Sequence, residues 1–351
     1  MTRTTTPQTT MQAAITTQWH QMQLQELTLP QPGVGQVRIR ICLAGICGSD
    51  VHIFLGHHPT AVSPVVQGHE LVGIVDAMGS MVDSSIEIGH RVVVDPLISC
   101  GSCEACRRGH LHVCRSLKLL GIHENGAFAE YCLAPANKVI AVPQGLSDQW
   151  AVLTEPFAVG VHVCQRAALE PGVRALVCGA GPIGLIVAMV AKLAGAEVVI
   201  SEISESRLKL AESFGFKTLD AGNNPQEQVA AITDQDGFDV VFEVTGSPKA
   251  LALAIDAARV RGKIVQVGFY SNPPNADLMK LTLKELTLVG SRVYTNEDFR
   301  RAVRLLSRVA ENKLLDLDKL ICEQTNLAGI EPAMQRMIAG DVVGKIVVDL
   351  R

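Results

Sequence analysis

The segment 174–195 constrains the fold of this chain more than any other. It begins with the apolar run RALVC and ends with the apolar run LIVAMVAKLAG, and the six residues between them are Gly179, Ala180, Gly181, Pro182, Ile183 and Gly184. Glycines at this spacing between a buried strand and a helix allow a pyrophosphate to approach the backbone at a helix N-terminus. The segment therefore predicts the first strand, turn and helix of a dinucleotide-binding parallel sheet, rather than an ordinary strand-to-helix turn.

A carboxylate ends the next predicted strand, AEVVISE. Glu202 follows the glycines by about 20 residues, the spacing at which an acid accepts hydrogen bonds from an adenosine ribose. Because a carboxylate repels a 2'-phosphate, Glu202 favours NAD over NADP. Arg207 lies on the following predicted helix and is expected to cover the adenine face. A solvated arginine on a helix surface is an equally good interpretation of Arg207.

The chain has 351 residues, a length typical of two domains. From 11 to 158 the apolar runs are short and alternate with polar residues, as in VRIRICLAG and ELVGIVDAMG, which indicates a β-rich domain. From 159 to 295, helical patterns alternate with continuous apolar runs such as FDVVFEV and KIVQVG, which is typical of a doubly wound parallel sheet. The fold class is therefore α/β.

Composition argues against two classes of partner. The formal net charge is -4 and aromatic residues make up 4% of the chain, so neither a broad basic surface nor a base-stacking platform for nucleic acid is expected. The glycine turn interrupts the longest uncharged stretch, 175–191, and no membrane span is expected. Residues 1–10 are expected to be a disordered leader without an apolar targeting region, which favours a cytoplasmic location.

Four of the ten cysteines are clustered in one loop. Cys100, Cys103, Cys106 and Cys114 lie within the segment 96–116. Thiols stay reduced in the cytosol, and four thiolates at this spacing can complete a tetrahedral shell around a structural zinc ion. An iron–sulfur cluster is the alternative, but the last gap is longer than in a ferredoxin run, and Arg115 rather than proline follows it.

A second set of metal-ligand types is scattered through the β-rich region. Cys47 opens CGSDVH, His69 and Glu70 lie in QGHELVG, and Glu155 lies in LTEPFAVGVH. Taken singly, each has an ordinary interpretation, such as a core cysteine or a solvated glutamate. Together, mixed ligands on separate loops indicate a catalytic zinc with a position open for water or a substrate oxygen.

These motifs, in this order and together with the terminal GKIVV, resemble those of the zinc-dependent medium-chain dehydrogenases of the sorbitol, polyol and threonine branch. The strings LGIHENGAFAEY and GSRVYTNEDF are most similar to bacterial L-gulonate or L-galactonate 5-dehydrogenases. The resemblance implies a GroES-like β-rich catalytic domain over 11–158 and 296–351, with a zinc lobe at 96–116. It also implies a Rossmann domain over 159–295.

The resemblance also implies roles for individual residues. Cys47, His69 and Glu70 would bind the catalytic zinc, with Glu155 as a fourth ligand or connected through water. Asp50 would orient His69, or else it caps its loop. Ser49 and His52 would pass the substrate proton to solvent, and Glu155 is a competing route. The alternative for His52 is an ordinary surface histidine without a role in the reaction. Two further residues are candidates for substrate contacts, with surface positions as their alternatives: Arg292 and His123.

The implied function is oxidation of a secondary hydroxyl of a small polyhydroxylated substrate, by zinc-alkoxide formation and hydride transfer to NAD. A sugar acid oxidised at its 5-position is the leading substrate. A neutral polyol or L-threonine is the alternative within the enzymes, and a catalytically idle NAD-binding protein is the alternative outside them. Cofactors are two zinc ions per chain and NAD, and the chain is expected to form a homodimer or homotetramer.

Five cysteines remain outside both sets of metal ligands. They lie mostly in apolar contexts, and we expect them to be small core residues: Cys42, Cys132, Cys164, Cys178 and Cys322.

Overall fold

The computed structural model describes residues 8–82 and 85–351, which divide into two compact units. Unit 1 comprises Met1–Glu155 and Val303–Arg351, and unit 2 comprises Pro156–Ala302. The chain passes from unit 1 to unit 2 after Glu155 and returns to unit 1 after Ala302. Of the leader predicted at residues 1–10, residues 1–7 lie outside the described part, and Thr10 already begins a strand.

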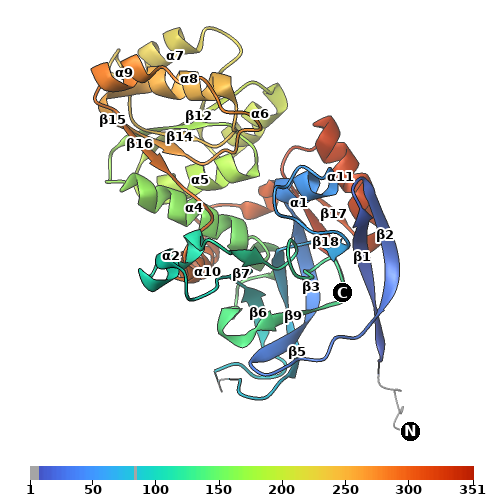
Figure 1. Cartoon of the computed structure of the whole chain (residues 1–351). Helices are drawn as coiled ribbons and strands as arrows, with labels where there is room; N and C mark the ends of the chain where they lie inside the picture. The colour runs from blue at the N-terminus through green and yellow to red at the C-terminus, as the bar shows by residue number, and fades with distance from the viewer. Residues whose placement is uncertain (1–7, 83–84) are drawn as a thin grey trace. The chain divides into compact units, whose positions relative to one another are not determined.

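Unit 1 is built on two larger sheets and one two-stranded sheet (Figure 1). A three-stranded sheet has the order β2-β1-β4, with β1 at Thr10–Gln18, β2 at Gln21–Thr28 and β4 at Val65–Val66. A seven-stranded sheet has the order β10-β6-β5-β3-β18-β17, with β9 paired to β3. Its strands are β3 Gln36–Ile46, β5 Glu70–Met78, β6 Arg91–Val94, β9 Tyr131–Pro135, β10 Val139–Ala141, β17 Ile321–Thr325 and β18 Lys345–Asp349.

The C-terminal segment completes the main sheet of unit 1. Strand β18 pairs antiparallel with β3 and parallel with β17, so the end of the chain lies beside residues 43–46. The remaining elements are short helices and the two strands of a small antiparallel sheet, β7 and β8: α1 Gly48–Phe54, β7 Leu97–Ile98, α2 Glu104–Arg107, η1 Leu111–Val113, β8 Lys118–Leu119, η2 Ala136–Lys138, α3 Asp148–Ala151, η3 Leu317–Leu320, η4 Leu327–Gly329 and α11 Ile330–Ala339. The return of the C-terminus to the β-rich region agrees with the GroES-like arrangement.

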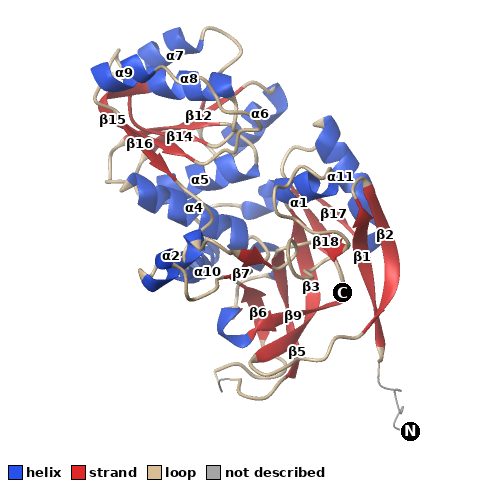
Figure 2. Cartoon of the chain, viewed as in Figure 1, coloured by secondary structure: helices blue, strands red, loops and turns tan. Residues whose placement is uncertain are grey.

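Unit 2 is a six-stranded parallel sheet in the order β13-β12-β11-β14-β15-β16, covered by helices on both faces, with α5 on one and α8 on the other (Figure 2). The strands are β11 Arg174–Cys178, β12 Glu197–Glu202, β13 Lys217–Asp220, β14 Phe238–Glu243, β15 Ala258–Gln266 and β16 Thr287–Gly290. The helices are α5 Pro182–Leu193, α6 Glu205–Ser213, α7 Pro225–Ile232, α8 Pro248–Ala257 and α9 Leu278–Leu283, while α4 Thr154–Ala167 and α10 Asn296–Asn312 span the unit boundaries. The predicted doubly wound sheet is confirmed.

Four of the five cysteines expected in the core are buried, but the prediction is wrong for Cys322. This residue lies on β17, the edge strand of the seven-stranded sheet, where exposed and half-buried side chains alternate. An edge strand packs only one of its faces, so an apolar context in the sequence does not guarantee burial.

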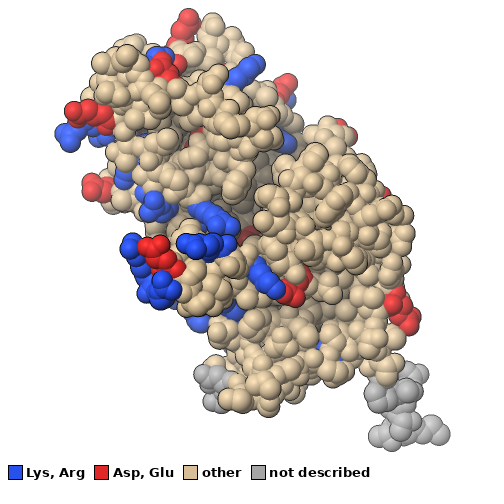
Figure 3. Space-filling model, in the orientation of Figure 1, with Lys and Arg blue, Asp and Glu red and all other residues tan. Residues whose placement is uncertain are grey.

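The distribution of charge and the length of the helices bear on the predictions about nucleic acid and membranes. On the face drawn in Figure 3, basic and acidic side chains are interspersed among uncharged ones. Within the described residues, the helices are all too short or too polar to cross a bilayer.

Replacing Ile39 by alanine tests the core of unit 1. Ile39 is fully buried on β3, between β5 and β9, and its truncation is expected to lower the free energy of unfolding by about 2–5 kcal/mol. Denaturant unfolding monitored by circular dichroism measures the change. Ile88→Ala, at a side chain that is 65% exposed, is the matched control and should stay within about 0.5 kcal/mol of the unaltered protein. Equal effects of the two substitutions would contradict this packing.

Candidate functional site

Three of the four expected catalytic ligands meet at one end of neighbouring strands. Cys47 follows β3 and caps the N-terminus of α1, while His69 precedes β5 and Glu70 begins it. Because Gly45 of β3 pairs with Glu70, the two strands bring these residues together. One ligand atom from each lies within 4.8 Å of the others, and His69 and Glu70 are buried.

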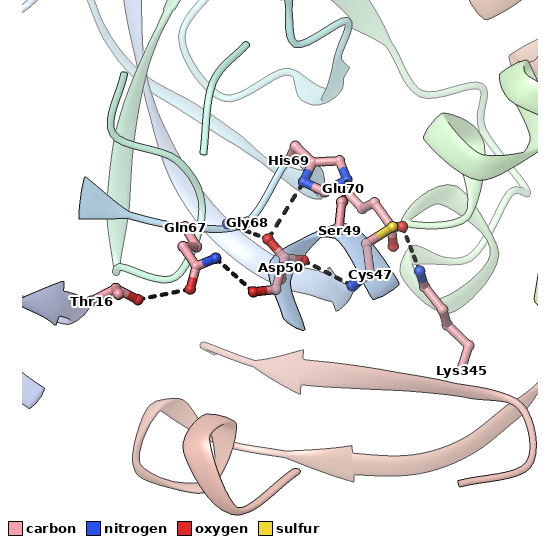
Figure 4. Close-up of polar contacts among 9 residues, drawn as sticks. All are labelled: Thr16, Cys47, Ser49, Asp50, Gln67, Gly68, His69, Glu70 and Lys345. Carbon is pink, nitrogen blue, oxygen red and sulfur yellow. Dashed lines mark hydrogen bonds and ion pairs between the residues drawn. The ribbon is translucent and has the colours of Figure 1, made fainter. Parts of the chain in front are cut away.

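Asp50 lies behind His69, as Figure 4 shows. One oxygen of its fully buried carboxylate accepts a hydrogen bond from the Cys47 amide at 2.8 Å, and the other is 3.6 Å from Nδ1 of His69. Burial lowers the pKa of His69, but the charge of Asp50 outweighs it, and the pKa is raised well above its usual value. Asp50 thus faces Nδ1 and leaves Nε2 of His69 for a metal ion.

The support for Asp50 extends to the first strand. Its backbone carbonyl accepts from Gln67 Nε2 at 2.9 Å, and Gln67 Oε1 accepts from the Thr16 hydroxyl at 2.8 Å. Both supporting side chains are fully buried (Figure 4). A buried, satisfied polar chain of this kind limits movement of the loop that bears Cys47.

Lys345, the lysine of the terminal GKIVV, has a contact that the sequence did not predict. Its ammonium group donates to Oε1 of Glu70 from the first residue of β18. Burial lowers the pKa of Lys345, but the charges of Glu70, Cys47 and Glu155 outweigh it and raise the pKa. One feature of the sequence could have indicated this contact: a lysine at the start of an apolar strand requires an acidic partner if the lysine is buried.

The donor set fits zinc. Cys47 offers a thiolate, His69 an imidazole nitrogen and Glu70 the oxygen Oε2, which is buried and has no hydrogen-bond partner in the described part of the chain. Glu155 lies outside this group, so its carboxylate is farther than 4.8 Å from at least one of the three ligand atoms. It is buried at the start of α4.

The four clustered cysteines also meet the geometry of a metal site. Their sulfur atoms are separated by 3.5 Å for Cys103–Cys106 and Cys100–Cys114, 3.9 Å for Cys103–Cys114 and 4.0 Å for Cys100–Cys106. Tetrahedral Zn–S bonds of about 2.3 Å place sulfur atoms about 3.8 Å apart. Hydrogen bonds from the backbone of Ser102 and Cys103 lower the pKa of Cys100 to about 6, which favours its thiolate.

The glycine turn of unit 2 has the form that the sequence predicts. Gly179 has φ +107°, and Gly181 caps α5, with Pro182 as the first helical residue and Ile183 next. A Cβ atom at Gly184 would overlap the carbonyl oxygen of Gly179. The turn therefore packs closely against the start of α5 and ends at a helix N-terminus, a position that suits a pyrophosphate.

Glu202 connects this turn to the neighbouring strand. Its Oε2 accepts from the Ala180 amide at 2.9 Å, and its Oε1 accepts from the amides of Ile203 and Ser204 at 2.7 and 3.1 Å. Arg207 Nη1 is 4.0 Å from Oε2. The carboxylate is thus fixed beside the turn, and Oε2 keeps a lone pair for a ribose hydroxyl.

Glu243 is a second buried carboxylate at this edge, and the sequence analysis missed it. It ends β14 and is fully buried. It accepts hydrogen bonds from the Thr245 and Gly246 amides, from Gln266 Nε2 at 2.7 Å and from the Tyr270 hydroxyl at 3.0 Å. In the sequence, the indication of this residue was a carboxylate directly after the run FDVVF. Through these hydrogen bonds, Glu243 fixes the loop after β14.

The remaining predicted residues have different surroundings. The Ser49 hydroxyl is 3.4 Å from His69 Nε2, while His52 is exposed on α1. His123 accepts from the Leu119 amide at 3.1 Å and contacts the Thr60 hydroxyl at 3.0 Å, and burial lowers its pKa. Both ring nitrogens of His123 are therefore engaged within the protein.

Arg292 is exposed in unit 2, shortly after β16. The next residue, Val293, has φ +42°, a strained conformation for a β-branched side chain.

Comparisons with known proteins agree with both units. Residues 33–144 match the alcohol dehydrogenase GroES-like domain, and residues 182–308 match the zinc-binding dehydrogenase domain. The chain is 38% identical to 2-dehydro-3-deoxy-L-galactonate 5-dehydrogenase of Pseudoalteromonas atlantica, over 87% of this chain and 89% of that protein. It is 33% identical to sorbitol dehydrogenase of Halalkalibacterium halodurans, over 91% and 93%.

A solved structure agrees as well. The alcohol dehydrogenase RspB of Escherichia coli, in complex with NADH, superimposes with a TM-score of 0.88 at 30% identity, covering 97% of this chain and 100% of that one. The chain belongs to the zinc-binding dehydrogenases with a GroES-like domain, and the resemblance seen in the sequence is confirmed. It is a zinc- and NAD-dependent alcohol or polyol dehydrogenase.

Zinc analysis tests the two metal sites. The purified protein should contain two zinc ions per chain and show no visible absorbance, because zinc thiolates are colourless. Cys106→Ser removes a ligand of the four-cysteine site and should lower the content to one zinc, measured by atomic emission. Cys322→Ser, at a cysteine outside both sites, should retain two. A brown protein containing iron would contradict the assignment.

Gly184→Ala tests the turn. The added methyl group would displace the Gly179 carbonyl, and NADH affinity should fall by about 10-fold or more in a fluorescence titration. Gly290→Ala is the control, since a Cβ there meets no atom within 4 Å. An unchanged dissociation constant for Gly184→Ala would show that the nucleotide binds elsewhere.

Proposed function

We propose that this chain oxidises a secondary hydroxyl of a small sugar acid, of the L-gulonate or L-galactonate type, at its 5-position with NAD as acceptor. The observation that carries the proposal is the convergence of Cys47, His69 and Glu70. Zinc at such a site supplies a Lewis acid that lowers the pKa of a substrate hydroxyl, and NAD accepts the hydride from the same carbon. The 5-dehydrogenase relative supports the substrate class.

The chain's own residues supply positioning and proton transfer. Asp50, whose carboxylate lies 3.6 Å from Nδ1 of His69, would orient this ring so that Nε2 faces the other ligands. Ser49, whose hydroxyl is 3.4 Å from that nitrogen, would accept the substrate proton, and this proton would pass by way of the cofactor ribose and the exposed His52 to solvent. Glu155, acting as a ligand or through water, is the competing route.

Arg292 is proposed to bind the substrate carboxylate. A guanidinium group pairs bidentately with a carboxylate, and the part of the chain that the structure describes provides no acidic partner for Arg292. The strained Val293 supports a functional role for this segment, since strain of this kind is concentrated at binding sites. His123, whose two ring nitrogens are engaged, is the less favoured contact.

A neutral polyol is the second candidate substrate, supported by the similarity to a sorbitol dehydrogenase. L-Threonine is the third, because relatives named L-threonine 3-dehydrogenase are 35% identical. None of the ten cysteines, all of which lie in the described part of the chain, forms a disulfide, which suits the proposed cytoplasmic location. A homodimer or homotetramer is also proposed, and light scattering would measure it.

A substrate screen tests the proposal. NADH formation is measured with hexonates, pentonates, hexitols and L-threonine, and each assay is repeated with NADP. We expect the highest kcat/KM with a hexonate and NAD, and at least about 10-fold less with NADP because Glu202 repels the 2'-phosphate. A preference for hexitols or L-threonine would instead support one of the alternatives.

Arg292→Ala separates acids from neutral substrates. Loss of a charge-assisted pair worth about 1.5–3 kcal/mol should raise the KM for the sugar acid by about 10-fold or more and leave hexitols unaffected. Arg300→Ala is the control, because Arg300 is exposed and donates a hydrogen bond to the Asn296 side chain. An unchanged KM for the acid would remove Arg292 from the site.

A further inference from the structure

A buried ammonium group lies beside the candidate catalytic ligands. Lys345 is only 3% exposed, and its acidic partner, Glu70, is fully buried (Figure 4). Removing a lysine from water costs several kcal/mol unless a charge of opposite sign is close. The pair therefore links a strand of the C-terminal segment to a residue of the candidate metal site.

The sheet register explains how the two side chains meet. Strand β3 lies between β5 and β18, and its Gly45 pairs with Glu70 on one side and Val347 on the other. A Cβ atom at Gly45 would overlap Oε2 of Glu70 and lie 3.1 Å from Cε of Lys345. The missing side chain at position 45 leaves the space across which Lys345 reaches Glu70.

The two oxygens of Glu70 consequently have different surroundings. Oε1 accepts from the lysine, whereas Oε2 is buried and has no hydrogen-bond partner among the residues that the structure describes. A carboxylate free of other bonds can ligate a metal with both oxygens, but an oxygen bound to an ammonium group is less available. Only Oε2 is left for an ion placed among Cys47, His69 and Glu70.

We propose that Lys345 is a positioning residue that limits Glu70 to one ligating oxygen and thereby keeps a coordination position open for the substrate. A catalytic zinc site has three protein ligands and one open position, and a second oxygen from Glu70 would occupy that position. Lys345 itself touches neither substrate nor metal. The inference rests on the proposed function, because it requires a metal ion at this site.

Cobalt substitution tests the inference in the full-length protein. Co²⁺ replaces zinc, and its visible ligand-field absorption weakens when the coordination number rises above four. Lys345→Met, which keeps the chain length but removes the charge, should weaken this absorption by about two-fold relative to the unaltered protein. The four-cysteine site contributes the same spectrum to every variant and cancels in the difference.

Two variants serve as controls. Lys345→Arg retains a cation for Oε1 and should restore the original spectrum. Lys138→Met removes the cation from another buried carboxylate of unit 1, Asp95, and should leave the spectrum unchanged. If Lys345→Met is insoluble, Lys345→Gln replaces it in the same measurement, with the same expected weakening.

The outcomes distinguish this inference from the proposed function. Two cobalt ions per chain with identical spectra for the unaltered protein and the neutral variant would overturn the role of Lys345 alone. A neutral variant that binds only one cobalt ion would also overturn it, because the lysine would then serve metal binding itself. One cobalt ion in the unaltered protein would overturn the metal site made by Cys47, His69 and Glu70.

Discussion

The pairing of β3 with β5 is the constraint on which the candidate centre depends. Its register sets Gly45 opposite Glu70, so the residue after β3 and the residues that begin β5 meet at one edge of the sheet. The addition of β18 on the other side of β3 brings Lys345 to the same edge. Residues far apart in the sequence are thus positioned by backbone hydrogen bonds of a central sheet, which local movements of a loop do not disturb.

In unit 2, two buried carboxylates position the backbone of the candidate nucleotide site. Glu202 accepts hydrogen bonds from the glycine turn and from the start of the next loop, while Glu243 fixes the loop after β14. Both carboxylates end parallel strands, where ligands bind in doubly wound sheets. Glu202, which we propose selects the nucleotide by its charge, is therefore also part of the structure of its site.

Much of this was predictable from the sequence because the signals are local. The glycine turn and the four cysteines each lie within one short segment, and the continuous apolar runs indicate the parallel strands. Strand β13 was not predicted, because the edge segment KTLD buries only Leu219. The Lys345–Glu70 pair was not predicted either, since it depends on the register of three strands and on space above Gly45. Both oxygens of Glu202 and both nitrogens of His123 have partners that only the folded chain supplies.

We propose that Cys47, His69 and Glu70 hold the zinc ion that serves the oxidation. Anomalous diffraction at the zinc edge, from crystals of the zinc-loaded protein, would locate this ion. We expect two peaks per chain, one of them about 2.0–2.3 Å from Cys47 Sγ, His69 Nε2 and a single oxygen of Glu70. A peak at the four cysteines alone, with none between Cys47 and His69, would contradict it.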